Sequence, residues 1–230
     1  MGLDTTNHID LFAKNIFTIN NKNTKFEKRN TMAGRPREFD REKALVKARD
    51  FFWQHGYEGT SMSDLVEVLG IASARIYKAF GSKEALFREA VKHYEEHEGG
   101  FAIKALQQQN IKAVITQLFQ EAIKLYTQTN HAYGCMVVSS ASVLSEENQD
   151  LLVWMKQQRI QRVKGLIQRF EQAKLDGQLQ EDADPEQLGQ YYGLVLHGLS
   201  VQARDGYSEQ MLLSNISLAL KNLDQYLVKP

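Results

Sequence analysis

The stretch GIASARIYKAFGSKEALF combines charged, aromatic and small side chains in a pattern that suits contact with DNA. Ile76 and Phe80 lie four residues apart, which places both on one side of a short helix. Arg75, Tyr77 and Lys78 are then left on its outer side. Arginine can form two hydrogen bonds with the edge of a guanine, whereas tyrosine and lysine can reach backbone phosphates. A solvated helix face without a partner is the alternative, and composition alone favours neither interpretation.

Three short helices are predicted to position these side chains. The first begins at Asp40 and ends at Gly56. Its apolar residues recur at spacings of three and four and form one face: Ala44, Leu45, Ala48, Phe51 and Phe52. The second begins with a capping box, in which the side chains of Ser61 and Asp64 each bond the backbone of the other residue. The third covers about residues 72–79. Helices joined by so short a turn predict a helix-turn-helix.

Residues 33–87 resemble the DNA-binding domain of the TetR family of transcriptional regulators. The matching segments are GYEGTSMSDLVEVLGI, RIYKAF and GSKEALF. The resemblance implies an all-α fold, with an N-terminal three-helix helix-turn-helix domain and a larger C-terminal helical domain for effector binding and dimerisation. It also implies a regulator, most often a repressor, that binds a palindromic operator in double-stranded DNA as a homodimer. A small-molecule effector would release it.

The same resemblance implies which residues contact DNA. They are Ser61, Ser63, Ser73, Ala74, Arg75, Tyr77, Lys78 and Lys83. The first two begin the second helix, the next three occupy base-reading positions, and the last three occupy phosphate or groove-edge positions. Ala72 stands where the family often has a capping serine, and Ala79 stands where an aromatic residue is frequent. Arg35 and Arg37, in the sequence GRPR, are candidates for a basic arm in the minor groove, and a flexible charged leader is the alternative.

Charge and composition restrict the classes of protein to which the chain can belong. The 230 residues carry no net formal charge, yet residues 1–31 and 32–93 each carry +2 and residues 94–230 carry −4. A basic N-terminal part fits a contact with a polyanion. One cysteine excludes an internal disulfide, and no apolar run approaches the roughly 20 residues that cross a bilayer. A cytoplasmic protein without a membrane partner is therefore expected.

Three parts are predicted along the chain. Residues 1–31 are polar and rich in asparagine, and we expect a disordered or loosely attached extension, with Met32 as a possible native start. Residues 32–81 form the DNA-binding domain, and residues 82–230 form the effector-binding and dimerisation domain. Further helices are predicted near 82–98, 101–108, 110–128, 136–144, 146–174, 185–204 and 208–227.

Glycines in the helix predicted over residues 185–204 indicate a close contact between helices. A glycine inside a helix costs about 1 kcal/mol relative to alanine, so a close approach should offset it. By resemblance, the last two helices form the dimer interface, and the residues expected there are Gly189, Gly193, Gly198, Leu213 and Leu220. Packing within one subunit is the alternative.

An effector pocket is expected among the middle helices, again by resemblance. Its candidate residues are Phe119, Ile123, Tyr126, Tyr133, Cys135, Met136, Trp154 and His197. Aromatic residues and methionines at helical spacing are also the ordinary content of a core, which is the simpler interpretation of each. Cys135 is further a candidate redox or electrophile sensor. No cofactor is expected.

The sequence HYEEH leaves one enzymatic alternative open. His93 and His97 lie one helical turn apart with Glu96 between them, a spacing found in zinc peptidases. A third ligand is not evident in the sequence, so a solvated helix face is the better interpretation. A helical-bundle metalloenzyme, a metal-responsive regulator and an interaction module without DNA binding remain the rivals to a DNA-binding regulator that is not an enzyme.

Overall fold

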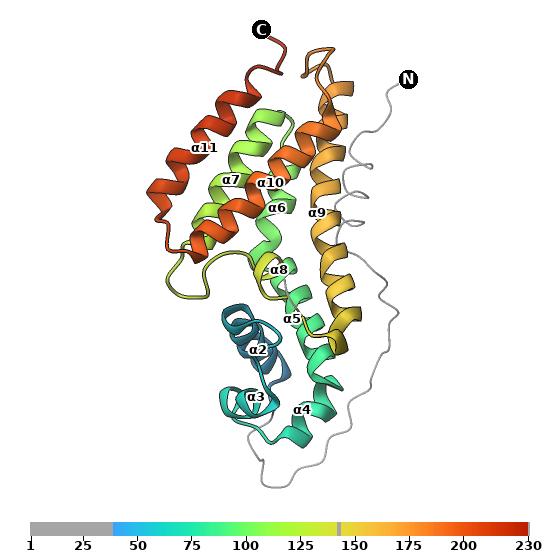
Figure 1. The fold of residues 1–230 in the computed structure, drawn as a ribbon, viewed down its shortest axis with the longest axis vertical. Coiled ribbons are helices and arrows are strands. Elements are labelled where there is room, and N and C mark those ends of the chain that lie inside the picture. Colours follow the sequence, from blue (N-terminus) through green and yellow to red (C-terminus); the bar gives the residue numbers. More distant parts are fainter. Residues whose placement is uncertain (1–38, 142–143, 230) are drawn as a thin grey trace, which may run out of the picture.

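The computed structural model describes residues 39–141 and 144–229, which are mostly helical. The described chain forms an elongated molecule in which three helices lie at one end and the other helices build the rest (Figure 1). The predicted extension 1–31, the possible start at Met32 and the arm residues Arg35 and Arg37 lie outside the described residues. Within the described ranges, no helix is both long and apolar enough to span a bilayer.

The three-helix unit has the caps that the sequence predicts. It consists of α2 (Arg41–His55), α3 (Met62–Leu69) and α4 (Ser73–Phe80). The side chain of Asp40 accepts from the backbone of α2, and both bonds of the Ser61–Asp64 capping box are present. Gly70 ends α3 in the left-handed conformation, with a φ of 66°, where a side chain would be strained. The predicted helix-turn-helix is therefore confirmed.

Helix α5 (Lys83–Glu96) completes the core of the three-helix unit. The ring of Phe87 packs edge-on against Phe52, with 5.1 Å between centroids, and against Tyr57 at the same centroid separation. Phe52 and Phe87 are fully buried. Helix α2 packs along α5, where Phe52 meets Phe87 and Trp53 meets Tyr94, and α8 (Met136–Ser139) also contacts α5. One continuous helix, α5, thus connects the three-helix unit with the rest of the molecule (Figure 1).

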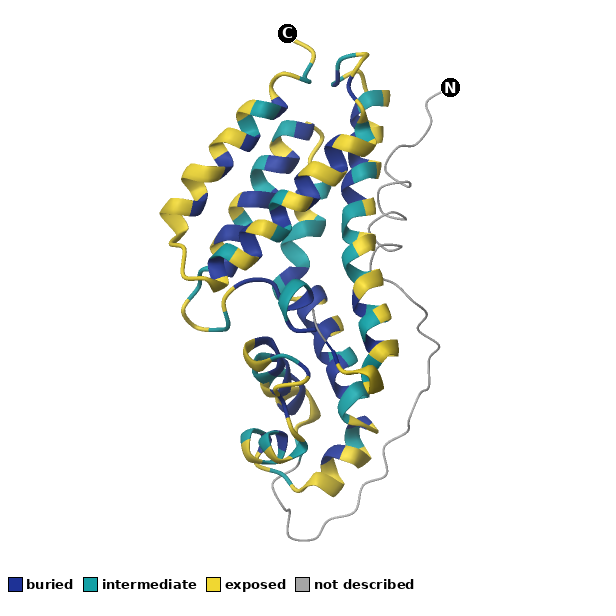
Figure 2. Cartoon of the chain, in the orientation of Figure 1, coloured by how far each residue is buried: buried dark blue, intermediate teal, exposed yellow. Residues whose placement is uncertain are grey.

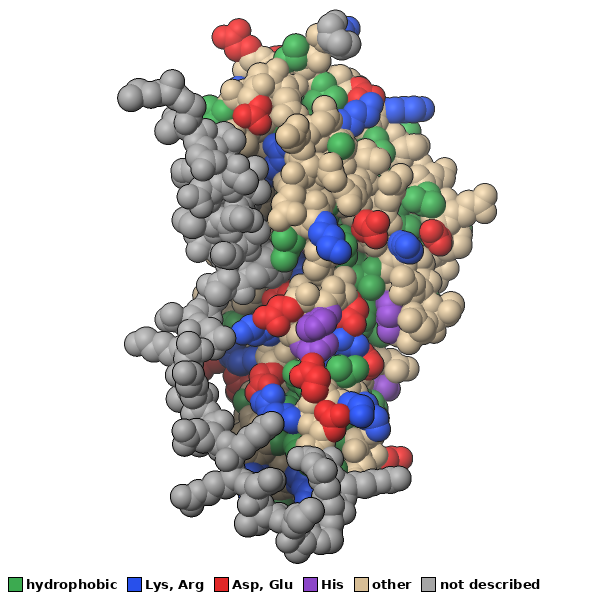
Figure 3. Space-filling view, turned by 180° about the vertical axis from the view of Figure 1, so that it is seen from behind, with side chains coloured by type: hydrophobic (Ala, Val, Ile, Leu, Met, Phe, Trp, Pro, Cys, Tyr) green, Lys and Arg blue, Asp and Glu red, His purple; other side chains and the backbone are tan. Residues whose placement is uncertain are grey.

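The rest of the fold is a bundle of helices. It contains α6 (Phe101–Leu106), α7 (Ile111–Tyr126), α8 (Met136–Ser139), α9 (Gln149–Leu175), α10 (Pro185–Arg204) and α11 (Glu209–Leu223), with single 3₁₀ turns at Glu98–Gly100 and Glu146–Asn148. Their buried faces share one core with the three-helix unit, as the dark blue segments of Figure 2 show. On the opposite face of the molecule, charged side chains of both signs are interspersed (Figure 3).

One helix is much shorter than predicted. The sequence predicts a helix over residues 136–144, but α8 ends at Ser139. The hydroxyl of Ser139 donates to the main-chain oxygen of Cys135 at 2.7 Å, and that of Ser140 donates to the oxygen of Met136. Serine side chains that bond the preceding turn weaken a helix, because they compete with the backbone ladder.

Gly189 and Gly193 lie at a close contact inside the chain, and their expected part in a dimer interface stays a prediction. A Cβ on Gly189 would lie 2.5 Å from Ile167 Cα, and one on Gly193 would lie 2.9 Å from a methyl carbon of Val163. Both partners belong to α9, so these glycines allow α9 and α10 to pack closely. A Cβ on Gly198 would meet no atom within 4 Å. Gly198 is therefore the one of these three glycines whose close packing partner is not found among the described residues.

Candidate nucleic-acid interface

Helix α4 presents the predicted recognition residues to solvent. Ile76 and Phe80 are buried, with exposed fractions of 1% and 5%. Every residue assigned a DNA contact on this helix is exposed: Ser73, Ala74, Arg75, Tyr77 and Lys78. Ala72 is the N-cap and makes no side-chain hydrogen bond, so α4 begins at Ser73 without a side-chain cap. The helix thus has one inner apolar side and one outer polar side.

The residues that begin α3 flank this surface. Ser61 and Ser63 are both exposed. The Ser61 hydroxyl already accepts a hydrogen bond from the backbone nitrogen of Asp64 at 3.1 Å, and Asp64 accepts from the backbone nitrogen of Ser61 at 2.7 Å. These bonds to Ser61 lower the pKa of Asp64 and keep its carboxylate charged. Among the described residues, the Ser63 hydroxyl makes no such hydrogen bond.

Lys83 lies against an aromatic ring instead of extending fully into solvent. Its ammonium group stands 4.1 Å from the centroid of the Tyr57 ring, a cation–π contact. Burial lowers the pKa of Lys83, while the charges of Glu58 and Asp64 act in the opposite direction. The lysine is half-buried, so a contact with a DNA phosphate would require its side chain to leave Tyr57. Its phosphate role stays a prediction.

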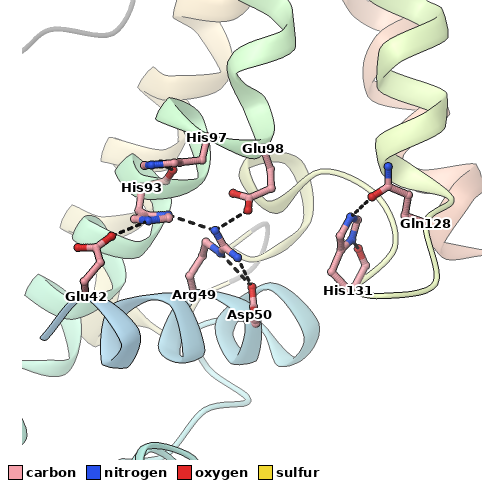
Figure 4. Close-up of polar contacts among 9 residues, drawn as sticks. Glu42, Arg49, Asp50, His93, His97, Glu98, Gln128 and His131 are labelled. Carbon is pink, nitrogen blue, oxygen red and sulfur yellow. Dashed lines mark hydrogen bonds and ion pairs between the residues drawn. The ribbon is translucent and has the colours of Figure 1, made fainter. Parts of the chain in front are cut away.

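A buried arginine joins α2 to the end of α5. Arg49 Nη1 lies 2.6 Å from a carboxylate oxygen of Glu98 and 3.1 Å from Nδ1 of His93, and Arg49 also pairs with Asp50 at 2.7 Å (Figure 4). His93 Nε2 lies 3.0 Å from an oxygen of Glu42. An arginine can only donate, so His93 accepts at Nδ1 and carries its proton at Nε2.

This arrangement does not favour the metal alternative. Both ring nitrogens of His93 are engaged, and Nδ1 of His97 lies 2.9 Å from the main-chain oxygen of His93. The two rings stack, with 4.0 Å between centroids. No group of three histidine, cysteine, aspartate or glutamate side chains converges as metal ligands within the described part of the chain. His93 therefore joins α2 to α5, and the two histidines are not arranged as a zinc site.

A second set of contacts joins α10 to the end of α2. The Arg204 guanidinium donates to the main-chain oxygens of Trp53 at 3.2 Å and Gln54 at 3.3 Å, and to the hydroxyl of Ser139 at 2.9 Å. The indole nitrogen of Trp53 donates to the main-chain oxygen of Gly134 at 3.1 Å. The last turn of α2 is thus held by α10 and by the loop between α7 and α8.

Most of the effector candidates lie in the core. Phe119, Ile123, Tyr126, Cys135 and Met136 are buried, whereas Trp154 and His197 are half-buried and Tyr133 is exposed. Burial, with the charges of Arg162 and Arg159, lowers the pKa of His197. Whether these residues bind an effector stays a prediction.

Cys135 has polar neighbours that the sequence did not predict. Arg162 Nη1 lies 3.2 Å from its sulfur, and the hydroxyl of Tyr94 donates to the sulfur at 3.5 Å. Arg162 also pairs with the buried Glu95 at 3.2 Å. Burial raises the pKa of Glu95, and the nearby Arg162 opposes that shift. The sequence signal for this pair was the presence of the charged residues Glu95 and Arg162 at inward-facing helical positions. Spacing alone, however, does not show which helices face each other.

Curated relatives match 82–83% of the chain. The model of the tetR family of bacterial regulatory proteins matches residues 44–90. The transcriptional repressor ComR of Escherichia coli (strain K12) is 30% identical over 193 residues, covering 82% of this chain and 90% of ComR. The uncharacterised regulator YezE of Bacillus subtilis (strain 168) is 30% identical over 196 residues, covering 83% of this chain and all of YezE (100%).

Solved structures agree with these matches. A cysteine variant of the TetR-family regulator CifR, in complex with a 26-base-pair operator, is 36% identical and covers 82% of this chain and 98% of the CifR chain, with a TM-score of 0.78. The reduced form of E. coli NemR, at 24% identity and a TM-score of 0.64, shares the fold; the match covers 83% of this chain and 98% of the NemR chain. The helix-turn-helix, the helical body and these relatives together show that the chain belongs to the TetR family of transcriptional regulators.

Proposed function

We propose that this chain is a repressor that binds a palindromic operator as a homodimer and leaves it when a small molecule binds. The observation that best supports this proposal is the arrangement of α4. This short helix buries Ile76 and Phe80 and exposes Arg75, Tyr77 and Lys78. Such a helix fits the major groove, where Arg75 reads a base edge and the other two side chains contact phosphates. The operator-bound CifR and the repressor ComR are relatives of this type.

An uncovered apolar face supports the homodimer. Tyr191, Leu194, Gly198 and Val201 follow each other at spacings of three and four, which places them on one face of α10. Leu194 is 70% exposed, as is Leu218 on α11. Leu213 and Leu220, which are also predicted interface residues, lie on α11. Leu213 is exposed and Leu220 is half-buried. A second copy would cover these residues and place two α4 helices about 34 Å apart for successive major grooves.

The proposal assigns different roles to two parts of the chain. Residues 32–81 bind DNA, and residues 82–230 dimerise and bind the effector. In this scheme the protein acts in the cytoplasm, where the operator is, and regulates without catalysing a reaction. Effector binding in the body would move α5 and change the distance between the two α4 helices, so that both no longer fit one operator.

Fluorescence anisotropy with labelled DNA tests the proposal. We expect tight, salt-sensitive binding to the DNA upstream of the chain's own gene and weaker binding to a scrambled sequence. Lys78→Ala should weaken binding to both DNAs, whereas Lys164→Ala, on an exposed position of α9, is the matched control and should not. Equal affinity of the wild type for both DNAs would contradict operator recognition.

A further inference from the structure

We propose that a groove between α2 and the loop joining α7 to α8 is a second ligand site, which takes a small aromatic anion. This interdomain groove has a volume of about 660 Å³. Its lining includes Lys47, Phe51, Val68, His131, Tyr133 and Arg204, together with polar side chains of α2 and of the loop. That volume lies within the usual range of small-molecule sites. Figure 1 shows the loop beside the end of α2, and Figure 4 shows His131 on this loop near Asp50.

The charges in the interdomain groove favour an anion. The nearest polar partner of the Lys47 ammonium is the main-chain oxygen of Val68, at 3.4 Å. Arg204 donates only to uncharged oxygens, and neither cation pairs with a carboxylate among residues 39–141 and 144–229. The acidic side chain in the lining, Asp50, is already paired with Arg49 at 2.7 Å. Two cations without carboxylate partners can hold a carboxylate or phosphate.

The uncharged part of the lining favours a flat, apolar body. Phe51 is half-buried and stacks on His55, with 4.1 Å between centroids. The ring of His131 is fixed, because it stacks on the buried Trp53 at 4.4 Å and its Nε2 lies 3.1 Å from Gln128. Tyr133, 44% exposed, supplies a further ring. Rigid aromatic walls lose little entropy when they pack against an aromatic ligand.

The position of Arg204 gives the interdomain groove a regulatory role, an inference that rests on the proposed repressor function. Its guanidinium lines the groove and also holds the main-chain oxygens of Trp53 and Gln54. An anion that binds this guanidinium competes with those neutral acceptors, because a charged acceptor forms the stronger hydrogen bond. The last turn of α2 is then held less firmly against α10, and operator affinity falls.

Calorimetric titration without DNA tests the site itself. The probes are benzoate and phenyl phosphate, with benzyl alcohol as the neutral control. We expect both anions to bind at millimolar concentration or below and the alcohol not to bind. Lys47→Ala should weaken anion binding about tenfold, since it removes a charged hydrogen bond. Lys43→Ala, on an exposed position one turn earlier on α2, is the matched control and should leave binding unchanged. Binding of the alcohol as strong as that of benzoate, or an unchanged affinity in Lys47→Ala, would overturn the site.

Operator binding tests the coupling separately. Saturating benzoate should lower operator affinity of the wild type by about tenfold or more, and of Lys47→Ala much less. Anion binding without any change in operator affinity would overturn the regulatory role. Anion binding by a protein that does not recognise its operator would refute the proposed repressor function and leave the ligand site standing.

Discussion

Arg204 Nη1 lies 3.2 Å from the main-chain oxygen of Trp53, a residue 151 positions earlier in the chain. This bond joins the last residue of α10 to the last turn of α2. Helix α10 and the three-helix unit are therefore in direct contact, in addition to their connection through α5.

Replacing Arg204 should loosen this contact. Arg204→Lys keeps the charge but cannot reach Trp53, Gln54 and Ser139 at once, because lysine lacks the planar fork of donors. We expect a loss of about 1–3 kcal/mol in the free energy of unfolding. Urea denaturation checks the loss, and Lys221→Arg, at an exposed position on α11, is the control. A variant as stable as the wild type would show that the three bonds contribute nothing.

Arg75 and Lys78 should affect DNA binding in different ways. Arg75→Ala should cost about 1–3 kcal/mol per half-site and relax the preference at one base pair. Lys78→Ala should weaken binding to every sequence and reduce the salt slope by about one per subunit. Salt titrations on operator and scrambled DNA distinguish them. The roles are reversed if Lys78→Ala alters base preference while Arg75→Ala changes only the slope.

The glycines of α10 should differ sharply in their tolerance of alanine. A methyl group on Gly189 would meet the backbone of Ile167 at 2.5 Å, so Gly189→Ala should destabilise the fold by about 1–3 kcal/mol despite the better helix propensity of alanine. Gly198→Ala meets nothing in its own chain and should leave the fold intact or stabilise it by up to about 1 kcal/mol. Thermal unfolding of both variants measures this, and equal losses would contradict the intrachain role.

A charge on the uncovered face of α10 should separate the subunits. Leu194→Glu places a carboxylate in the proposed dimer interface, where burial without a partner is costly. We expect a monomer by sedimentation and a large loss of operator affinity with little change in helicity. Leu175→Glu, at a position 82% exposed at the end of α9, is the control. A Leu194→Glu protein that stays dimeric would place the interface elsewhere.

His197 should make the fold sensitive to mild acid. Burial, Arg162 and Arg159 lower the pKa of His197 from its ordinary value of 6.5, so the unfolded chain takes up a proton more readily than the folded one. The contribution of His197 to stability is therefore complete above about pH 7 and is lost as the pH falls through 6.5 toward the folded pKa. His197→Gln should lose less stability than the wild type between pH 7.5 and about 5.5 in urea denaturation. Parallel losses in the two proteins would show that His197 titrates normally.

The features that sequence could predict are those set by neighbouring residues. The cap at Asp40, the capping box of Ser61 and Asp64, and the end of α3 at Gly70 depend on contacts a few residues apart. The inner side of α4 follows from the spacing of Ile76 and Phe80, because a helix has a fixed period.

The features that sequence could not predict depend on contacts between distant residues. Arg49 meets His93 across 44 positions, and Arg162 meets Glu95 across 67. Periodicity shows that a residue lies on an inner face but not which helix it faces. For the same reason, the glycines of α10 indicated a close approach of helices but not that α9 of the same chain is the partner of Gly189 and Gly193.

The aromatic contacts of Phe87 have a consequence for how the chain folds. Phe52 and Tyr57 belong to the three-helix unit, yet the ring that packs against both, Phe87, comes from α5. A fragment that stops after α4 would expose these aromatic surfaces and lack the partner that orders them. The three-helix unit is therefore not an autonomous module that can be transplanted by cutting before Lys83; a working chimera must carry α5 with it.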